Sequence, residues 1–378
     1  MNQDQSIVPW WRVQFTEDEA LSAANAIRQE RLSLGPLTAE FEAKLADKLL
    51  VPYVVATTSG STALLMALIA IGVGPGDEVI IPNRTWIAAA HAVMMLGAKV
   101  VLVDVCADIP NINTDQIRAK INARTKAIIP TALNGRAVDM KSINSLAAEY
   151  GLCVIEDAAQ ALFSRSDDVF IGTQSPINCF SLSVAKLIPT GQGGFLTTND
   201  KKIYQDLRKI RTHGVDDLFS CNFTRFGFNF RFTDLQASIG LTQLLKLDQK
   251  IKSLNRIYYQ YEIGLKTCSR VRLIPVAVSK GELPLYIEVL CSHRDELMEF
   301  LDSRHIQYKA FYPNLNRAAY FDCGDSFPNA NVFETRGLTL PCGPDQSPES
   351  IDRVIQAIHE FEHEPLHNQQ NSECPVTA

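Results

Sequence analysis

The chain has 378 residues, of which 46% are hydrophobic and 21% are charged, so it holds enough apolar material for a large core and is not globally disordered. Lys and Arg number 36 against 42 Asp and Glu, which gives a net charge of −6 without any long basic run. This balance argues against a nucleic-acid-binding protein and against a polybasic membrane anchor.

Between residues 51 and 200, short β-branched runs alternate with helical patterns. In chain order, strands are expected at Tyr53–Ala56, Asp77–Pro82, Lys99–Val105, Lys126–Leu133, Cys153–Glu156, Asn178–Leu182 and Gly194–Thr198. Helices are expected between them at Ser59–Ile71, Trp86–Leu96, Thr114–Ile121 and Met140–Tyr150. Strands that lack polar alternation and are separated by helices indicate a sheet covered on both faces, that is, an α/β fold with a mostly parallel sheet.

After about Leu245 the pattern changes to that of a small α+β domain. Its expected elements are a long helix at Leu245–Leu265, a strand–helix–strand segment at Leu285–Cys291, Arg294–Arg304 and Gln307–Phe311, and a helix at Ser347–Phe361. We therefore predict a large domain over 39–244 and a small C-terminal domain over 245–364. The N-terminal segment 1–38 carries a helix at Glu17–Arg31 and is expected to pack on the small domain, and the polar tail 365–378 is expected to be disordered.

The cysteines and the N-terminus bear on the compartment. The 9 cysteines are scattered singly, without a CxxC pair, which is typical of reduced thiols and of neither a disulfide framework nor a zinc site. No apolar signal segment and no run of about 18 apolar residues is found. We expect a cytoplasmic protein that binds no metal.

The segment Thr58-Ser59-Gly60-Ser61-Thr62 lies between an expected strand and an expected helix. Small hydroxyl residues and a glycine at a helix N-terminus leave backbone N–H groups free to face an anion, which the helix dipole also favours. The same residues are common helix caps, so both interpretations stay open. The segment is not a Walker loop, because no Gly-Lys-Ser/Thr follows.

An acidic pair, Glu156 and Asp157, ends the strand expected at Cys153–Glu156. Ligands of parallel sheets bind at the carboxyl ends of the strands, where a buried carboxylate needs a cation or a hydrogen-bond donor. The alternative is that Asp157 only caps the following helix. This segment alone does not decide between the two.

Lys186 lies among apolar residues in a loop that runs into the glycine-rich turn TGQGG at 190–194. Apolar surroundings lower the pKa of an amine, which is the condition for Schiff-base chemistry, although a single lysine is most often a solvated surface residue. Trp86 follows the strand expected at Asp77–Pro82 and could stack on an aromatic ligand, although tryptophan is more commonly a core residue.

Together these signals converge on one kind of site. A phosphate cradle, an aromatic plate, a carboxylate and an apolar-flanked lysine are the parts that a pyridoxal 5′-phosphate site requires; here they would be Ser61, Thr62, Trp86, Asp157 and Lys186. The lysine would form the imine, and the carboxylate would keep the pyridine nitrogen protonated so that the ring can accept electrons.

With these residues in view, the sequence resembles the DegT-type sugar aminotransferases, pyridoxal phosphate enzymes of fold type I. The resemblance runs from about residue 31 to 361 and rests on six segments in order: SGSTAL at 59–64, GPGDEVIIP at 74–82, RTKAIIP at 124–130, VIEDAAQA at 154–161, the Lys186 loop with TGQGG, and GFNFRFTDLQASIGL at 227–241. It implies a three-layer α/β/α fold with a mostly parallel sheet and a smaller C-terminal α+β domain.

The resemblance also implies roles for individual residues. Lys186 matches the Schiff-base lysine and proton carrier, and Asp157 matches the partner of the pyridine nitrogen. The other cofactor contacts implied are Ser61, Thr62, Trp86, Gln160, Ser181 and Asn229. In the family the residue matching Asn229 reaches the phosphate from a neighbouring subunit, so a homodimer with shared active sites is implied. Arg231 is a plausible clamp for the carboxylate of the amino donor, because its planar fork suits that group.

The implied reaction moves an amino group from glutamate or glutamine to a keto sugar, usually one linked to a nucleotide. Members that dehydrate carry histidine at the lysine position, so Lys186 favours transamination. The TGQGG turn favours amination at C4 of a 4-keto-6-deoxy sugar; C3 amination, an aminocyclitol ketone and dehydration are the alternatives. The sequence departs from the family at three places that bear on the sugar: Ala132-Leu133-Asn134-Gly135, Ser183, and Asn314-Leu315-Asn316. Ser183 and Asn316 are nevertheless expected to face the substrate.

Overall fold

The structure is a computed structural model that describes residues 7–216, 222–321 and 324–365. Its centre is a seven-stranded sheet with the strand order β1-β9-β8-β5-β4-β2-β3. The strands are β1 (Tyr53–Thr57), β2 (Glu78–Pro82), β3 (Lys99–Val103), β4 (Thr125–Ile128), β5 (Cys153–Asp157), β8 (Ile177–Ser181) and β9 (Gly194–Thr198). β9 runs antiparallel to both of its neighbours, and the pairs among β3, β2, β4, β5 and β8 are parallel.

Neighbouring residues of each central strand contribute to two different cores. Val54 belongs to one core and Val55 to the other, and Val154 and Ile155 divide in the same way. Because successive strand residues point to opposite faces, the near-continuous apolar runs in the sequence reflect burial on both sides of the sheet. The predicted fold, three-layer α/β/α with a mostly parallel sheet, is confirmed.

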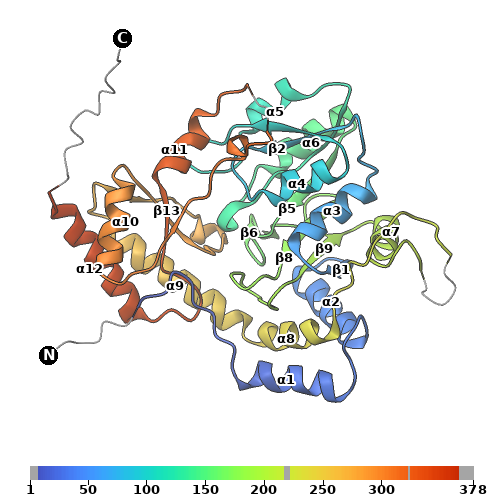
Figure 1. The fold of residues 1–378 in the computed structure, drawn as a ribbon, viewed down its shortest axis with the longest axis horizontal. Helices are drawn as coiled ribbons and strands as arrows, with labels where there is room; N and C mark the ends of the chain where they lie inside the picture. The colour runs from blue at the N-terminus through green and yellow to red at the C-terminus, as the bar shows by residue number, and fades with distance from the viewer. Residues whose placement is uncertain (1–6, 217–221, 322–323, 366–378) are drawn as a thin grey trace, which may run out of the picture.

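Helices cover both faces of this sheet (Figure 1). One face packs against α3 (Gly60–Ala70), α4 (Ala88–Met95) and α7 (Lys201–Arg211). The other packs against α2 (Pro36–Leu49), α5 (Thr114–Lys120), α6 (Met140–Tyr150) and α8 (Asp234–Leu245). The loops that join strands to helices lie at the ends of the strands, and functional side chains can gather there.

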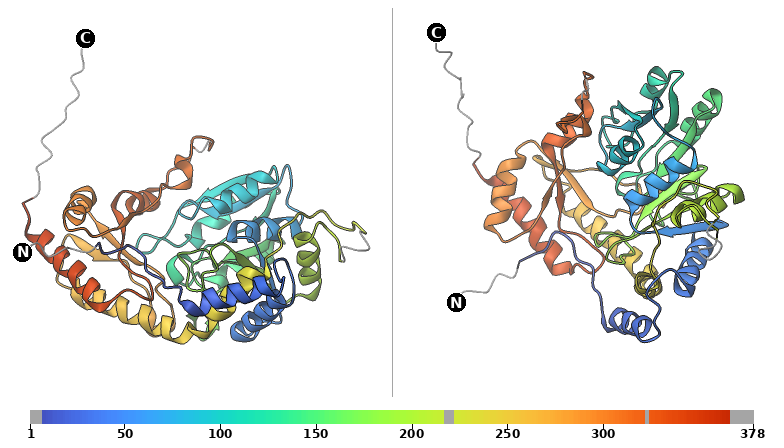
Figure 2. Two further views of the ribbon diagram at one scale, coloured as in Figure 1. Left: turned by 60° about the horizontal axis from the view of Figure 1, so that its bottom comes forward. Right: turned by 45° about the vertical axis from the view of Figure 1, so that its right-hand side comes forward.

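A second, antiparallel sheet follows, with the order β10-β11-β13-β12. Its strands are β10 (Val271–Leu273), β11 (Ile287–Cys291), β12 (Lys309–Ala310) and β13 (Gly337–Leu340). Three helices share a separate apolar core with it: α9 (Leu247–Gly264), α10 (Arg294–Ser303) and α12 (Pro348–His363). In Figure 2 these elements form a distinct unit beside the larger layered body, and α9 extends between the two.

Several elements were not predicted from the sequence. They are α2, α7, α8, α11 (Pro328–Arg336), β10, β13, the hairpin of β6 (Arg165–Ser166) and β7 (Val169–Phe170), and the 3-10 turns η1 (Leu133–Gly135), η2 (Val278–Lys280) and η3 (Leu315–Arg317). The strand expected over Lys126–Leu133 stops at Ile128, because the chain leaves the sheet and turns through η1. The helix predicted over Leu245–Leu265 begins at Leu247, and α8 ends just before it.

The N-terminal segment makes two different contacts. Its first described residues pair with the C-terminal unit, through bridges from Val8 to Ile306 and from Trp11 to Cys342. The helix α1 (Glu17–Arg28) instead packs on α8, with Ser22 hydrogen-bonded to Thr242 at 2.8 Å. Packing of the whole segment on the small domain is therefore too simple, and the domain limits at 38, 244 and 364 stay predictions. Apart from Pro365, the tail expected to be disordered lies outside the described residues.

Candidate active site

The carboxyl ends of β5 and β8 bring the predicted acid and the predicted amine to one edge of the central sheet. Asp157 is the last residue of β5 and is paired with Cys179 on β8. The chain leaves β8 at Ser181, and Lys186 lies in the loop that follows. Each of Asp157 and Lys186 shifts the pKa of the other through its charge, so the two form one electrostatic unit.

Asp157 is buried, with only 4% of its surface exposed. Its Oδ1 accepts one hydrogen bond, from the backbone N–H of Ala159 at 3.1 Å. Burial raises the pKa of Asp157 to about 6, against the lowering effects of that hydrogen bond and of Lys186. The side chain closes a short turn and caps no helix, so it remains available to a cationic ligand group.

Glu156, the other member of the acidic pair, is separated from this site. Successive strand residues point to opposite faces, and Glu156 is buried near the backbone N–H groups of Gly172 and Gln174, which oppose the effect of burial on its pKa. Burial raises its pKa to about 7. Only Asp157 therefore belongs to the candidate site.

Lys186 is half-buried, and its Nζ donates a hydrogen bond of 3.4 Å to the hydroxyl of Tyr286. That hydroxyl in turn donates to the carbonyl of Ala185 at 2.9 Å, which fixes its orientation. Burial lowers the pKa of Lys186 to about 8; the charge of Asp157 opposes this shift and that of Lys309 reinforces it. A large share of the amine is thus neutral near pH 8 and able to attack a carbonyl carbon.

The N-terminus of α3 lies beside Ser181. A side chain at Gly60 would come within 3.0 Å of the Ser181 Cβ, and one at Gly194 would meet the backbone of Ser59 at 2.5 Å, so two glycines permit this approach. Ser59 caps the helix and accepts from the N–H of Thr62 at 3.1 Å. Free backbone N–H groups at a helix start, next to hydroxyl groups, are able to bind an anion.

The two hydroxyl residues predicted there differ. The Thr62 hydroxyl donates to the Ser59 carbonyl at 2.7 Å and accepts from the Ser59 N–H at 2.9 Å. The Thr62 hydroxyl is therefore engaged in the capping box. Ser61, by contrast, is exposed, and its hydroxyl makes no hydrogen bond to another described residue. The helix cap is therefore present, and because it leaves Ser61 exposed, the anion site stays a prediction that the cap does not exclude.

Trp86 is 52% exposed, so it is no core residue. Its ring meets that of Tyr312 edge-on, with centroids 5.5 Å apart and an angle of 86°. Arg84 supports Tyr312 from behind: its guanidinium lies 4.8 Å from the Tyr312 ring, and its Nη1 donates to the Tyr312 carbonyl at 3.1 Å. The exposed face of Trp86 is thereby held in a fixed orientation.

Gln160 is held by Asn134, a residue that the sequence showed only as a departure from the family pattern. The N–H of Asn134 donates to Gln160 Oε1 at 2.9 Å, and its amide group contacts the backbone N–H and C=O of Tyr286. Asn134 adopts a left-handed backbone with φ 54°, a conformation that asparagine tolerates better than most residues. It joins the loop after β5 to the start of β11.

The remaining predicted residues are placed as follows. Arg231 Nε donates to Asn229 Oδ1 at 2.9 Å, and the Arg231 backbone bridges to Thr57 at the end of β1. Among the described residues, the Ser183 hydroxyl has only a long contact, from the Ser181 hydroxyl at 3.5 Å, whereas the Ser183 carbonyl accepts from the N–H of Lys186 at 3.0 Å. The Asn316 side chain accepts from Asn83 Nδ2 at 2.9 Å, so that oxygen is engaged in tying two loops together.

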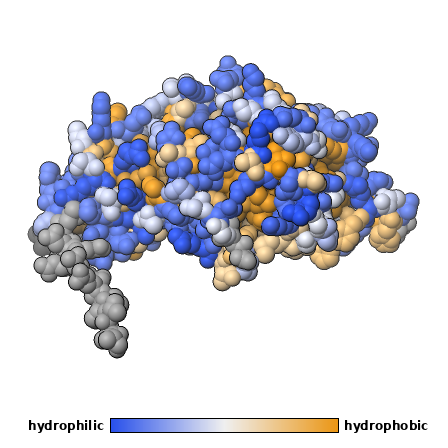
Figure 3. Space-filling view, turned by 90° about the horizontal axis from the view of Figure 1, so that it is seen from above, coloured by the Kyte–Doolittle hydropathy of each residue, from blue (hydrophilic) through white to orange (hydrophobic). Residues whose placement is uncertain are grey.

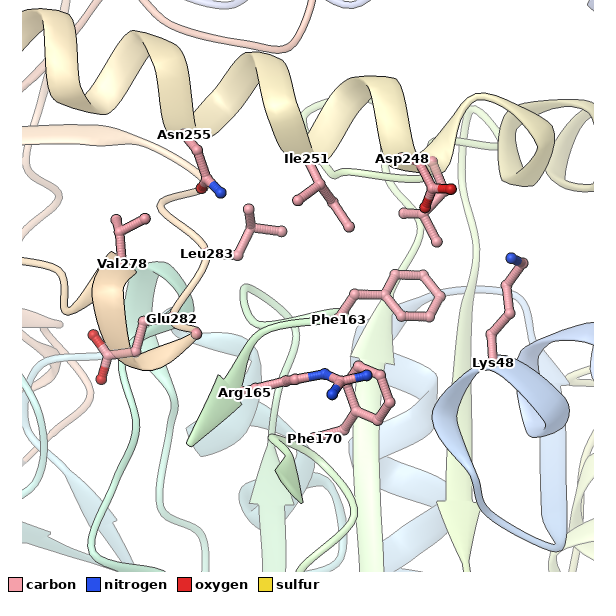
Figure 4. A pocket seen from close by; sticks show the side chains of 12 residues that line it. Lys48, Phe163, Arg165, Phe170, Asp248, Ile251, Asn255, Val278, Glu282 and Leu283 are labelled. Carbon is pink, nitrogen blue, oxygen red and sulfur yellow. The ribbon is translucent and has the colours of Figure 1, made fainter. Parts of the chain in front are cut away.

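A cavity lies elsewhere, between α9 and the β6–β7 hairpin (Figure 4). It measures about 370 Å³ and is lined by Phe163, Phe170 and Ile251, with Arg165 stacked over Phe170 at 4.0 Å. None of the predicted site residues lines it. In the described part of the chain, no group of three His, Cys, Asp or Glu side chains could hold a metal ion, and no helix is long and apolar enough to span a bilayer.

Residues 14–359 match the model of the DegT/DnrJ/EryC1/StrS aminotransferase family. The chain belongs to this family. The GDP-perosamine synthase of Caulobacter vibrioides is 35% identical over 334 residues, covering 86% of this chain and 90% of that protein. The UDP-2-acetamido-2-deoxy-3-oxo-D-glucuronate aminotransferase of Pseudomonas aeruginosa is 32% identical, with 88% and 92% covered.

Solved structures of this aminotransferase family share the fold. Streptomyces venezuelae DesV, determined in complex with a ketimine intermediate, superposes with a TM-score of 0.90 at 30% identity, covering 95% of this chain and 99% of that one. The predicted family and enzyme class are confirmed. Two residues of the candidate site, Tyr286 and Lys309, were missed because no local motif marks them.

Proposed function

We propose that this aminotransferase uses pyridoxal 5′-phosphate to move an amino group from glutamate or glutamine to a nucleotide-linked keto sugar. The observation that carries the proposal is the pair at the sheet edge, an amine with its pKa lowered to about 8 beside a buried carboxylate. Membership of the family and the names of the relatives support the amino transfer and the nucleotide-sugar class.

The residues present fit the cofactor. Asp157 is a buried acid with one backbone donor on Oδ1, and a protonated pyridine nitrogen would supply its missing cationic partner. The start of α3, Ser61 and Ser181 suit a phosphate, and Trp86 offers an exposed ring face. When bound, the cofactor supplies an aldehyde carbon for imine formation and a ring that accepts electrons.

The chain's own groups would then divide the work. Lys186 would hold the cofactor through its neutral amine and, while that amine is free, would carry a proton to and from the substrate carbon. Tyr286 holds the Lys186 Nζ within reach while that amine is free. Asp157 would hold the ring nitrogen in its cationic form through an ionised carboxylate. Arg231 is the proposed clamp for the carboxylate of the amino donor.

For the acceptor we propose a 4-keto-6-deoxy sugar, supported by the TGQGG turn and by the perosamine synthase relative. A second candidate, amination at C3, is favoured by the Pseudomonas relative that is named for a 3-oxo sugar. Ser183 is the less constrained of the two predicted sugar contacts, because Asn316 is engaged with Asn83.

We further propose that the enzyme is a cytoplasmic homodimer with shared sites, in which Asn229 reaches the neighbouring phosphate. Phe226 and Phe228, close to it in sequence, are 74% and 63% exposed, and large apolar side chains exposed together are typical of a protein–protein interface. Figure 3 shows apolar side chains gathered in patches on one face of the molecule.

The test is reconstitution of the purified protein with pyridoxal 5′-phosphate. We expect a yellow protein that borohydride bleaches and that glutamate or glutamine converts to the amine form of the cofactor. Lys186→Ala should abolish the borohydride-trapped adduct, and Lys126→Ala, an exposed lysine at the opposite edge of the sheet, should not. Failure of the wild-type protein to bind the cofactor, or to accept nitrogen from either donor, would contradict the proposal.

The acceptor is identified by mass spectrometry. The aminated enzyme is presented with GDP-, dTDP- and UDP-linked keto sugars that carry the ketone at C3 or at C4, and the product is examined for nitrogen from a labelled donor. Labelled nitrogen in a C4-amino product supports the first candidate, and labelled nitrogen in a C3-amino product supports the second. A product that loses water and gains no nitrogen would instead indicate a dehydratase.

A further inference from the structure

The N-terminal segment places an indole ring at the candidate site. The backbone N–H of Trp10 donates to the Gln307 side chain at 3.3 Å, and the Trp10 carbonyl accepts from the backbone N–H of Cys342 at 2.9 Å. The Trp10 ring lies 6.3 Å from that of Tyr286, which holds Lys186. The N-terminal segment is remote in sequence from every family motif. Its Trp10 ring is nevertheless separated from the Lys186 amine only by the Tyr286 side chain.

Lys309 lies between the Trp10 indole and Trp86, the ring that is predicted to stack on the cofactor. The Nζ of Lys309, on β12, is 5.2 Å from the centre of the Trp10 ring and 5.9 Å from that of Trp86. Lys309 is exposed and forms no ion pair with any described residue. Its charge reaches Lys186, since it helps to lower the pKa of that amine. The site thus has an accessible, uncompensated cation at its mouth.

Two other cations near the site have partners within the chain. Arg136 pairs with Glu288 at 2.6 Å and is almost completely buried. Arg84 is 2% exposed and lies against the rings of Phe311 and Tyr312. Neither guanidinium can turn toward a ligand without breaking these contacts, and both are removed from solvent. Lys309 is free to meet an incoming anion.

We propose that Trp10 and Lys309 form the subsite for the nucleotide part of the substrate, with the ammonium on the diphosphate and the indole face against the base. This inference rests on the proposed function, because it assigns residues to its nucleotide-linked acceptor. A flat apolar ring next to a cation matches a base joined to phosphate. The amino donor offers carboxylates and no ring, so it would leave Trp10 unused.

The experiment measures binding of GDP, UDP and dTDP, and of the matching nucleosides, to the cofactor-loaded enzyme by titration calorimetry. For Lys309→Met we expect the Kd of the preferred diphosphate to rise by about tenfold to a hundredfold, as for loss of a charged hydrogen bond, with little change for the nucleoside. Trp10→Leu should weaken both ligands, and Trp10→Phe should recover part of that loss. Lys126→Met is the matched control and should bind as the wild type does.

Other outcomes would overturn the subsite. They are an unchanged diphosphate Kd in both Lys309→Met and Trp10→Leu, no binding of any of the three diphosphates by the wild type, or a Km for glutamate that rises in Lys309→Met more than the diphosphate Kd does. The last result would assign Lys309 to the donor carboxylate. Failure of the proposed function is separate: the wild type would then not accept nitrogen from glutamate or glutamine at all.

Discussion

Burial acts on Asp157 and Lys186 in opposite directions, and both shifts move the groups toward neutrality. The pKa of the acid rises to about 6 and that of the amine falls to about 8, although each is opposed by the charge of the other. The protein thus holds a carboxylate that lacks a sufficient cation and an amine that readily gives up its proton. A ligand with a cationic ring nitrogen and an aldehyde group could pair with the Asp157 carboxylate and react with the Lys186 amine.

The lowered pKa of Lys186 predicts the pH dependence of imine formation. In the cofactor-free enzyme the amine becomes neutral with a midpoint of about pH 8, well below the 10.5 of a solvated lysine. The rate of trapping of pyridoxal should therefore rise through about pH 8 and level off above it. Stopped-flow absorbance over this range measures it. A rate that keeps rising toward the midpoint of a solvated lysine would show that the amine is not desolvated.

The raised pKa of Asp157 predicts a conflict between stability and function. Its folded-state pKa of about 6 exceeds the ordinary 3.8, so ionisation destabilises the cofactor-free fold as the pH rises through this interval, and the full cost is present above about pH 6. Asp157→Asn should therefore stabilise the cofactor-free protein at pH 8 by about 2–3 kcal/mol, with no gain below about pH 4.

Urea unfolding of the cofactor-free variant and wild type at both pH values measures this difference. The same substitution should abolish amino transfer, because a neutral amide cannot hold the ring nitrogen in its charged form. A variant that is less stable than the wild type at pH 8 would show that the carboxylate has a partner in the cofactor-free protein.

At the scale of elements, the start of α3 joins two tasks that are usually considered separately. Ser59 and Thr62 close the capping box, while Ser61 and the free N–H groups face outward beside Ser181. The helix can begin abruptly at the sheet edge because the glycines at 60 and 194 leave room for the neighbouring backbone. Its position and its positive end then follow from the same few residues.

Two substitutions in this turn should affect different quantities, one the affinity for the cofactor and the other the stability of the fold. Ser61→Ala should weaken cofactor binding by about tenfold, the value of one hydrogen bond to a charged group, and leave the unfolding free energy of the cofactor-free protein unchanged. Thr62→Val should lower that free energy by about 1 kcal/mol through loss of the capping box and have the smaller effect on cofactor binding. Fluorescence titration and urea unfolding measure the two quantities. The reverse pattern would mean that the Thr62 hydroxyl leaves its cap to bind phosphate.

The parts of the site that the sequence predicts are those that follow directly from a strand end. Asp157 ends β5, Lys186 follows β8, and the apolar runs of these strands are visible in the sequence. Tyr286 and Asn134 could not be predicted, because their partners lie 100 and 152 residues away in the chain. Patterns of local periodicity carry no information about such contacts. The helix α8 was not predicted at all, and the predicted helix begins at Leu245, the last residue of α8 and two residues before α9.

At the scale of the whole molecule, buried polar groups connect the central sheet to the C-terminal unit. Arg136, just after η1, pairs with Glu288 of β11 at 2.6 Å and donates to the carbonyls of Ile274 and Pro275. Asn134 Nδ2 donates to the same carboxylate at 3.1 Å. The active-site loops around Gln160 and Tyr286 are attached to this network, so the relative position of the two units and the shape of the site are set together.

Removing the cation of this buried ion pair should lower the free energy of unfolding. Arg136→Met leaves the Glu288 carboxylate buried without its cation, and we expect a loss of about 3–5 kcal/mol in unfolding free energy. The double variant Arg136→Met with Glu288→Leu should recover much of it, because a buried pair replaced by apolar groups is often neutral. Urea unfolding of both variants and of Glu288→Leu alone completes a double-mutant cycle, which gives the interaction energy of the pair. A single Arg136→Met variant as stable as the wild type would show that water reaches Glu288.

The contact between Trp10 and Gln307 has a consequence for the synthesis of the chain. The two residues are 297 positions apart, so Trp10 leaves the ribosome long before its partner exists. The strands β2 to β5 can pair during translation, because their partners follow closely, but the N-terminal segment must wait for β12 and β13. A nascent chain halted before residue 300 would carry Lys186 and Asp157 but would lack Lys309 and the residues that hold Trp10. The proposed nucleotide subsite is therefore completed last, at the end of translation, although Trp10 is among the first residues made.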